Sequence, residues 1–210
     1  MRLYSFYSST YVPIWEKFFF PSVPKSFDLV PLTIPEEYAK TKYGDEGFWK
    51  MCRWGGGERV RLVKQHQGEI VAFCGCDQEF FGDCVPDLLS RMEDRDFLTP
   101  NNATESGPIR LCADFQVIRC TPMTLAYQEK VYSEIGDGDD EWILNAHRDM
   151  VKWMELPRNL YWNLAGTGWT KGQSIPKPPN GMLHFHANWT VGLENKLSLL
   201  EAARNAVKNI

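Results

Sequence analysis

The residues from Ile70 to Asp83 constrain this chain more than any other stretch. An apolar run without a charged residue, Ile70 to Cys76, leads directly into two acids, Asp77 and Glu79. The run predicts a buried strand, central in a parallel sheet. The acids then lie at its C-terminal end, where open α/β sheets bind their ligands. Residues i and i+2 of an extended segment point the same way, so the two carboxylates are expected side by side.

Two adjacent carboxylates repel each other and are costly unless a cation lies between them. Mg²⁺ or Mn²⁺ carrying a diphosphate is the natural cation for such a pair. A simpler interpretation is a polar turn after a strand, in which acids are common. The local motif alone favours this simpler interpretation, so the metal hypothesis needs support from elsewhere in the chain.

Length, charge and composition set the class of protein. A chain of 210 residues predicts one domain, and its alternation of strand-like and helix-like segments is typical of an α/β fold. The net charge of -4 argues against a nucleic-acid-binding protein, which would carry a basic stripe. No signal peptide opens the chain and no apolar run is long enough to span a bilayer, so we expect a soluble, cytoplasmic protein.

The aromatic and cysteine residues add two expectations. Eight Trp and twelve Phe are many for this length, so some are expected to line a pocket, where they can stack on a sugar or a base. The six Cys include no CxxC pair, which makes a zinc ribbon a weak hypothesis. Four of them lie in apolar segments, where reduced Cys behaves as a small hydrophobic residue.

The N-terminal third offers candidates for binding a nucleotide. Arg2 to Ser8 reads as a first strand followed by a polar turn, and in nucleotide-binding α/β domains this turn holds the base and ribose. Tyr7, Ser8 and Tyr11 are therefore candidates, although ordinary turn chemistry explains them equally well. Arg53 and Arg61 lie on predicted helices before the acidic strand and could reach a phosphate. Most basic residues on helices are only solvated.

Local signals place the elements around these candidates. Gly55-Gly56-Gly57 is not a phosphate loop, because no Lys-Ser or Lys-Thr follows it, and we expect a flexible break in the helical segment there. Thr121 followed by Pro122 predicts a helix start, with Thr as the N-cap. Residues 110–119 predict another strand, whose apolar pattern is interrupted by Asp114. Asp114 therefore either faces the site or pairs with a neighbouring arginine.

Two segments near the C-terminus complete a possible site. Residues 182–189 form a strand-like segment that carries His184 and His186 on one face. Carboxylate oxygens together with one imidazole suit Mn²⁺ well. Lys196 follows Gly192 at the start of the last predicted helix, and a helix N-terminus with a Lys is a phosphate site by two mechanisms.

Taken together, these segments resemble the GT-A glycosyltransferases, which transfer sugars from nucleotide diphospho-sugars. Asp77-Gln78-Glu79 matches the position of the family's DxD motif after a hydrophobic strand. The run from His186 through Gly192 to Lys196 resembles its late His…Gly…Lys motif. Two further segments resemble parts of the family. Leu111 to Arg119 resembles the strand that contributes to the donor site, and Asp139 to Asn145 resembles its Asp-rich segment with a downstream Asn. The narrower resemblance is to capsid-glycan glycosyltransferases of large algal viruses, which would place the protein in the host cytoplasm.

The resemblance implies a fold and a set of metal and donor ligands. It implies a Rossmann-like, mixed and mostly parallel sheet flanked by helices, in one domain over residues 1–210. Mn²⁺ or Mg²⁺ would be held by Asp77, Glu79 and His186, with His184 as the runner-up for the imidazole. The longer Glu79 departs from the usual second Asp of the motif, which puts its role in more doubt. Gln78 would belong to the donor-binding residues, and Lys196 would touch the β-phosphate.

The resemblance also implies the reaction. A sugar, hexosyl or deoxyhexosyl, would move from a UDP-sugar to a hydroxyl of a glycan or glycoprotein acceptor, with retention of configuration. Asp114 and the acids at 139–141 would bind donor-sugar hydroxyls. If the configuration were inverted instead, one acid would act as base on the acceptor hydroxyl, and Asp114, Asp140 and Glu141 are the candidates.

Two other functions compete with this one. A sugar-nucleotide nucleotidyltransferase shares the α/β fold and the metal, but it should carry a Gly-rich, basic loop after the first strand. The turn here, Ser8-Ser9-Thr10-Tyr11, contains no glycine. A non-catalytic carbohydrate- or nucleotide-binding module fits the aromatic content but would have no use for a metal triad.

Overall fold

The computed structural model describes residues 1–39, 44–103, 107–136, 140–164 and 168–208. Its centre is a six-stranded sheet in which every strand except β6 runs in the same direction. The strands, in their order across the sheet, are β2 (Asp28–Thr33), β1 (Arg2–Tyr7), β3 (Ile70–Gly75), β6 (Gln116–Arg119), β5 (Phe97–Pro100) and β7 (Trp153–Leu156). The expectation of a mixed, mostly parallel α/β sheet is confirmed.

The apolar run that precedes Asp77 forms β3, which is central because it pairs with β1 on one side and β6 on the other. Val71 and Phe73 face a core beneath the long helices, whereas Ala72 and Cys74 face a second core on the opposite side. All four side chains are fully buried. A strand covered on both faces needs apolar residues at every position, which explains the unbroken run.

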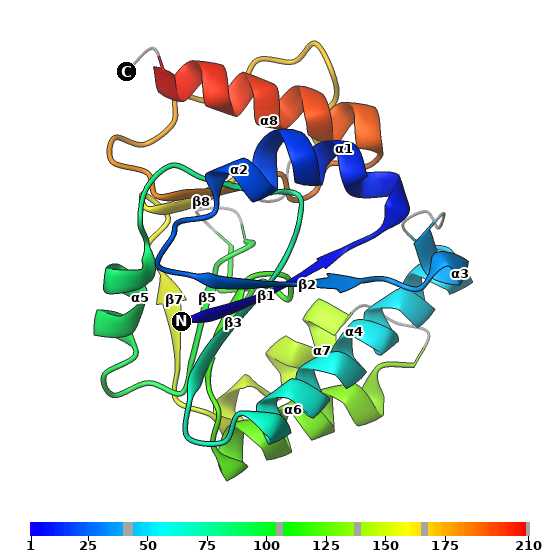
Figure 1. Cartoon of the computed structure of the whole chain (residues 1–210), viewed down its shortest axis with the longest axis vertical. Helices are drawn as coiled ribbons and strands as arrows, with labels where there is room; N and C mark the ends of the chain where they lie inside the picture. Colours follow the sequence, from blue (N-terminus) through cyan, green and yellow to red (C-terminus); the bar gives the residue numbers. More distant parts are fainter. Residues whose placement is uncertain (40–43, 104–106, 137–139, 165–167, 209–210) are drawn as a thin grey trace.

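Helices cover both faces of the sheet (Figure 1). One face is covered by α4 (Glu46–Gln65), α6 (Pro122–Glu134) and α7 (Asp140–Ala146). On the other side, the N-terminal helical segment lies along α8 (Leu193–Lys208), and the two contribute Phe18 and Leu200 to one buried apolar core. That segment comprises η1 (Ser9–Tyr11), α1 (Val12–Ile14), η2 (Trp15–Phe19) and α2 (Phe20–Ser22). The remaining helical elements are α3 (Glu36–Ala39), α5 (Val85–Arg91) and η3 (Arg148–Met150).

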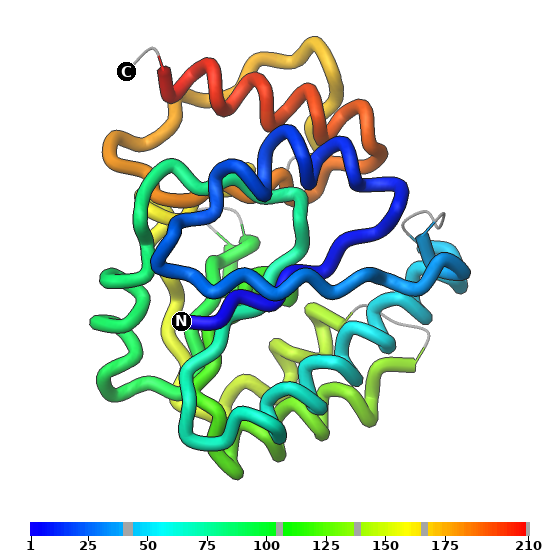
Figure 2. The backbone as a smooth tube through the Cα atoms, in the orientation of Figure 1, coloured from blue at the N-terminus to red at the C-terminus, as the bar shows by residue number. Residues whose placement is uncertain are grey.

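A second, three-stranded sheet lies between the central sheet and α8. It consists of β4 (Gln78–Phe80), β9 (His184–His186) and β8 (Tyr161–Asn163), with β9 in the middle. The antiparallel register pairs Gln78 with His186 and Phe80 with His184. The tube in Figure 2 shows how the end of the chain returns to the segment that follows β3. This pairing joins parts of the chain that are more than a hundred residues apart.

Two local expectations were wrong. The glycines at 55–57 do not break a helix, because α4 runs without interruption from Glu46 to Gln65. They let α6 and the residues after it approach: a Cβ on Gly56 would lie 3.0 Å from Ile135 Cδ1, and one on Gly57 3.3 Å from the Tyr132 ring. The strand expected over residues 110–119 is confined to β6, and Asp114 lies in bends before it.

Among the described residues, no helix is both long enough and apolar enough to cross a bilayer.

The helix start predicted at Thr121 is confirmed and is a capping box, in which Thr121 and Thr124 each accept a hydrogen bond from the other's backbone N–H. We expect Thr121→Ala to lower the free energy of unfolding by about 1–2 kcal/mol, because the cap is lost. Urea denaturation measures this. Ser133→Ala, at an exposed position near the end of the same helix, is the control and should cost less than about 0.5 kcal/mol. Equal losses in the two variants would contradict the role of the cap.

Candidate active site

Asp77 lies in the bend between β3 and β4, where the chain passes from the central sheet to the second one. Its carbonyl oxygen accepts a hydrogen bond of 2.9 Å from the Ala187 N–H, which extends the pairing of β4 with β9. This pairing brings His186 opposite the residues that follow β3. The acid at the end of the buried strand and the late histidine are therefore neighbours, although the sequence separates them widely.

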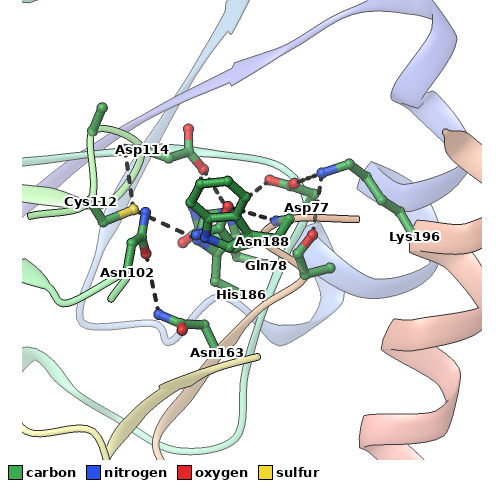
Figure 3. Close-up of polar contacts among 12 residues, drawn as sticks. Asp77, Gln78, Asn102, Cys112, Asp114, Asn163, His186, Asn188 and Lys196 are labelled. Carbon is green, nitrogen blue, oxygen red and sulfur yellow. Dashed lines mark hydrogen bonds and ion pairs between the residues drawn. The ribbon is translucent and has the colours of Figure 1, made fainter. Parts of the chain in front are cut away.

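Three potential metal ligands converge there (Figure 3). Nε2 of His186 lies 3.4 Å from Oδ1 of Asp77 and 3.2 Å from Oδ2 of Asp114. One ligand atom from each of the three residues lies within 4.8 Å of the others. We call Asp77, Asp114 and His186 the acid–imidazole cluster.

Lys196 adds a positive charge to the cluster. It comes from the first turn of α8, and its ammonium group donates hydrogen bonds to Oδ2 of Asp77 and, at 3.3 Å, to the carbonyl oxygen of Ala187. The side chains of Lys196 and Asp77 are both only 15% exposed. The Lys predicted to lie at a phosphate site is therefore held against the acid predicted to lie at a metal site.

Gln78 fixes the position of Asp114. Its amide nitrogen donates to Oδ2 of Asp114 at 2.6 Å, and its amide oxygen accepts from Nε2 of His184 at 2.6 Å. Gly75 leaves room for the same carboxylate, because a Cβ at this position would lie 2.7 Å from both Asp114 oxygens. Any larger residue would displace the carboxylate. The end of β3 is thus shaped around Asp114.

Burial and charge set opposite protonation states for the two histidines. Burial lowers the pKa of His184 to about 3, and the charge of His186 acts in the same direction. Burial also acts to lower the pKa of His186, but the Asp77 carboxylate, together with hydrogen bonds to Asp114 and Asp77, outweighs it and raises the pKa well above its usual value. His186 is therefore a cation between two carboxylates, whereas His184 is neutral and belongs to the core.

The charges of the Asp77–Lys196 pair stabilise each other. Burial acts to raise the pKa of Asp77, but Lys196 and His186 outweigh it and hold the pKa far below its ordinary value. Burial acts to lower the pKa of Lys196, and Asp77 reverses this effect. Both groups are charged at neutral pH, so the site contains fixed ions of both signs in a largely dry environment.

Glu79, expected as a metal ligand, lies outside the acid–imidazole cluster. Because Asp77 belongs to a bend and not to β4, the i, i+2 rule does not apply to the pair. Glu79 points to the opposite side of the small sheet, where Oε1 accepts a 2.6 Å hydrogen bond from Nε of Arg204. Burial, opposed by Arg204, raises the pKa of Glu79 to about 7. Asp114 occupies the place that the sequence pattern suggested for Glu79.

The described acids of α7, Asp140 and Glu141, are not members of the cluster and are paired with arginines. Asp140 Oδ2 lies 3.5 Å from a guanidinium nitrogen of Arg59. Glu141 forms an ion pair with Arg110 and accepts a 2.5 Å hydrogen bond from Asn102. Asp139, which belongs to the same resembling segment, lies outside the described residues.

The predicted nucleotide-binding residues differ in their placement. Tyr11 is near the cluster: burial raises its pKa, with Lys196 opposing and Asp77 adding to the shift. Ser8 is buried and accepts a backbone hydrogen bond from Tyr11. Tyr7 stacks on Trp15, with ring centroids 4.4 Å apart, and packs against the core.

The structure brings neither of the two predicted phosphate-binding arginines to the cluster. Arg53 donates to the carbonyl oxygen of Ile135 and lies over the Tyr132 ring, whereas Arg61 pairs with Glu58 along the exposed face of α4. Arg59, between them on the same helix, is the buried one, and it donates to the carbonyl oxygen of Ala113 at 3.0 Å. Arg59 precedes Leu62 and Val63 by three and four residues, so the helical period places it on the same buried face. This spacing was the sequence signal that could have identified Arg59.

The fold can be compared with solved structures. A glycosyltransferase involved in glycosylating the major capsid of PBCV-1 superposes with a TM-score of 0.62 at 8% identity, over 95% of this chain and 98% of that one. The galactosyltransferase LgtC superposes with a TM-score of 0.56 at 10% identity, over 100% of this chain and 96% of that one. The glycosyltransferase GlyE of Streptococcus pneumoniae TIGR4 superposes with a TM-score of 0.58 at 11% identity, over 99% of this chain and 62% of that one.

The chain has the GT-A glycosyltransferase fold. This confirms the fold that the sequence resemblance implied. The chain covers less than two thirds of the length of GlyE: 62% of the GlyE chain compared above and 45% of the chain in a second GlyE structure. Neither a family model nor a curated protein matches the sequence.

The neutral His184 makes a prediction about acid stability. The unfolded chain takes up a proton on this histidine near pH 6.5, whereas the folded protein does so only near pH 3. The contribution of the neutral His184 to the free energy of unfolding is therefore fully present above pH 6.5 and is lost as the pH falls toward 3. We expect the free energy of unfolding of the wild type to fall by about 2 kcal/mol more than that of His184→Gln between pH 6.5 and 5. Denaturant titrations at each pH measure this, and parallel profiles would contradict the buried neutral imidazole.

Proposed function

We propose that this protein is a metal-dependent glycosyltransferase that moves a sugar from a UDP-sugar to a hydroxyl group of a glycan or glycoprotein acceptor, with retention of configuration. The observation that carries the proposal is the acid–imidazole cluster with Lys196 beside it, at the C-terminal end of the central β3 strand. Ligands of open α/β sheets bind at this end. The glycosyltransferase fold of the solved neighbours supports the same conclusion.

The three residues fit Mn²⁺ or Mg²⁺. Two carboxylates and one imidazole are a donor set that suits Mn²⁺. Their ligand atoms lie within 4.8 Å of one another, and ligands across a divalent ion are about 4–5 Å apart. The glycine at 75 leaves the space that the Asp114 carboxylate needs. When bound, such an ion supplies Lewis-acid stabilisation of the leaving diphosphate.

Lys196 has a separate role in this proposal. Its ammonium group is held by Asp77 and the Ala187 carbonyl oxygen in the first turn of α8, so its position is fixed before a substrate arrives. A fixed cation stabilises negative charge that develops on a departing diphosphate without reorganising. The N-terminal end of the α8 dipole adds to the effect.

The stereochemical part of the proposal rests on the acids. Asp140 and Glu141 each face an arginine, so neither is placed as a general base for the acceptor hydroxyl. Asp114, the third candidate base, is a metal ligand in this proposal. Retention requires no base, so these assignments support the retaining mechanism. We assign Asp140 and Glu141 to the framework that holds residues 110–113, through Arg59 and Arg110, and Asp114 to direct contact with the bound groups. LgtC, which shares the fold, was solved with donor and acceptor sugar analogues.

Variants of the three acids separate the proposed metal site from the one suggested by the DxD spacing. We expect Asp77→Asn and Asp114→Asn to weaken Mn²⁺ binding by at least about 10-fold, because each removes a charged ligand. Glu79→Gln is the matched control and should bind Mn²⁺ as the wild type does. Mn²⁺ titrations followed by electron paramagnetic resonance measure this. Loss of binding in Glu79→Gln alone would show that the cluster is not the metal site.

Nucleotide binding tests the function itself. In calorimetric titrations with UDP, GDP and CMP, each with and without Mn²⁺, we expect UDP to bind only with the metal. Lys196→Gln should weaken the binding of UDP by about 10-fold, because one charged contact to a phosphate is lost. Arg61→Gln, an equal charge change on the exposed face of α4, should have no effect. Failure of every nucleotide to bind, with or without Mn²⁺, would overturn the proposed function.

A further inference from the structure

A second group of side chains lies next to the acid–imidazole cluster and has no part in it. The Arg110 guanidinium carbon lies 4.7 Å from the centre of the Trp189 ring and 5.4 Å from the centre of the Trp142 ring. We call Arg110, Trp142 and Trp189 the aromatic wall. It joins three segments of chain: the residues before β6, helix α7 and the loop between β9 and α8.

The aromatic wall is held in place from behind. Arg110 forms an ion pair with Glu141, whose side chain is only 11% exposed and which also accepts a hydrogen bond from Asn102. One turn further along α7, Asn145 binds both the N–H and the carbonyl oxygen of Leu111, at 2.8 and 3.0 Å. The guanidinium is therefore positioned by a buried polar network before any ligand binds, and the Trp142 ring lies against it.

The front of the wall is open to solvent. The Trp142 side chain is 68% exposed, more than any other large apolar residue in the described part of the chain. Val191 at 62% and Ile109 at 40% are also exposed, and they belong to two of the same three segments. Large apolar residues exposed together are costly in water and mark binding surfaces.

The wall is attached directly to the proposed catalytic cluster. Ala187, two residues before Trp189, donates to the Asp77 carbonyl oxygen and accepts from Lys196. On the other segment, the Cys112 thiol lies 3.8 Å from Nδ1 of His186. Trp189 also has a φ of 58°, in the left-handed region that a tryptophan rarely adopts. Backbone strain of this kind persists where the surroundings fix it and gathers at functional sites.

We propose that the aromatic wall binds a neutral pyranose ring of the acceptor, stacked on Trp142, so that the acceptor hydroxyl is directed toward the cluster. The apolar C–H face of a sugar ring matches an exposed indole, and the guanidinium edge can donate to ring hydroxyls. The Arg110 charge is compensated by Glu141, which favours a neutral sugar over an acidic one. This inference rests on the proposed function and gives it an acceptor class.

The test uses the full chain labelled with 5-fluorotryptophan, in which the ¹⁹F signal of Trp142 is assigned from Trp142→Phe. The probes are the methyl glycosides of glucose, galactose, xylose, fucose and rhamnose, each titrated with and without UDP and Mn²⁺. We expect at least one glycoside to shift the Trp142 signal in a saturable way. Calorimetric titration of the same glycoside measures the variants that lack the Trp142 signal: Trp142→Ala should weaken the binding by about 10-fold, and Trp142→Phe, which keeps an aromatic face, by less.

The controls keep the two proposals apart. Phe20→Ala removes another exposed aromatic side chain, 60% exposed on α2, and should bind the glycoside as the wild type does. Trp142→Ala should bind UDP and Mn²⁺ normally. If no glycoside shifts the Trp142 signal while UDP binds with Mn²⁺, the proposed acceptor site at the aromatic wall is overturned and the proposed function stands. If UDP fails to bind but a glycoside shifts Trp142, the protein is a sugar-binding module and the proposed function fails.

Discussion

Three largely buried charged groups, Asp77, His186 and Lys196, meet the partly exposed Asp114 where β3 leaves the central sheet. Asp77 and Asp114 face the imidazole of His186, and Lys196 compensates Asp77 from α8. An isolated buried charge would be neutralised or would destabilise the fold. The mutual compensation keeps Asp77, His186 and Lys196 ionised, as the opposite directions of their pKa shifts show. In the proposed metal site, a divalent ion would take the place of the proton on His186.

The fold brings these groups together by a small number of contacts. β3 ends at a glycine that leaves room for Asp114, and the short β4 pairs with β9, so that His186 lies beside Asp77. α8 then packs on the N-terminal helical segment and places Lys196 at its first turn. The same pairing of β4 with β9 places Trp189 at the edge of the cluster. The proposed donor and acceptor surfaces therefore share one loop, residues 187–192.

The sequence predicted the parts of this site that local patterns encode. The unbroken apolar run predicted β3, which is confirmed. Asp77, His186 and Lys196 were predicted from the end of that strand and from the segment before the last helix, and the structure brings these three residues together, while their roles stay predictions. Glu79 lies outside the cluster because a bend at Asp77, consistent with the polar turn of the simpler interpretation, separates Asp77 from β4. Asp114 was noticed as an interruption of an apolar segment, but its distance to His186 depends on tertiary contacts. The continuity of α4 through three glycines likewise depends on its packing against Tyr132 and Ile135.

The most direct test of the account is the ligand sphere of Mn²⁺ bound to the wild-type chain. Electron spin-echo envelope modulation detects a directly bound imidazole nitrogen, and ¹⁵N-histidine labelling identifies it. We predict one histidine nitrogen on the metal, present in the wild type and in His184→Gln and absent in His186→Gln. A metal bound without any nitrogen coupling, or a coupling that survives in His186→Gln, would contradict the assignment of Asp77, Asp114 and His186 as the metal site.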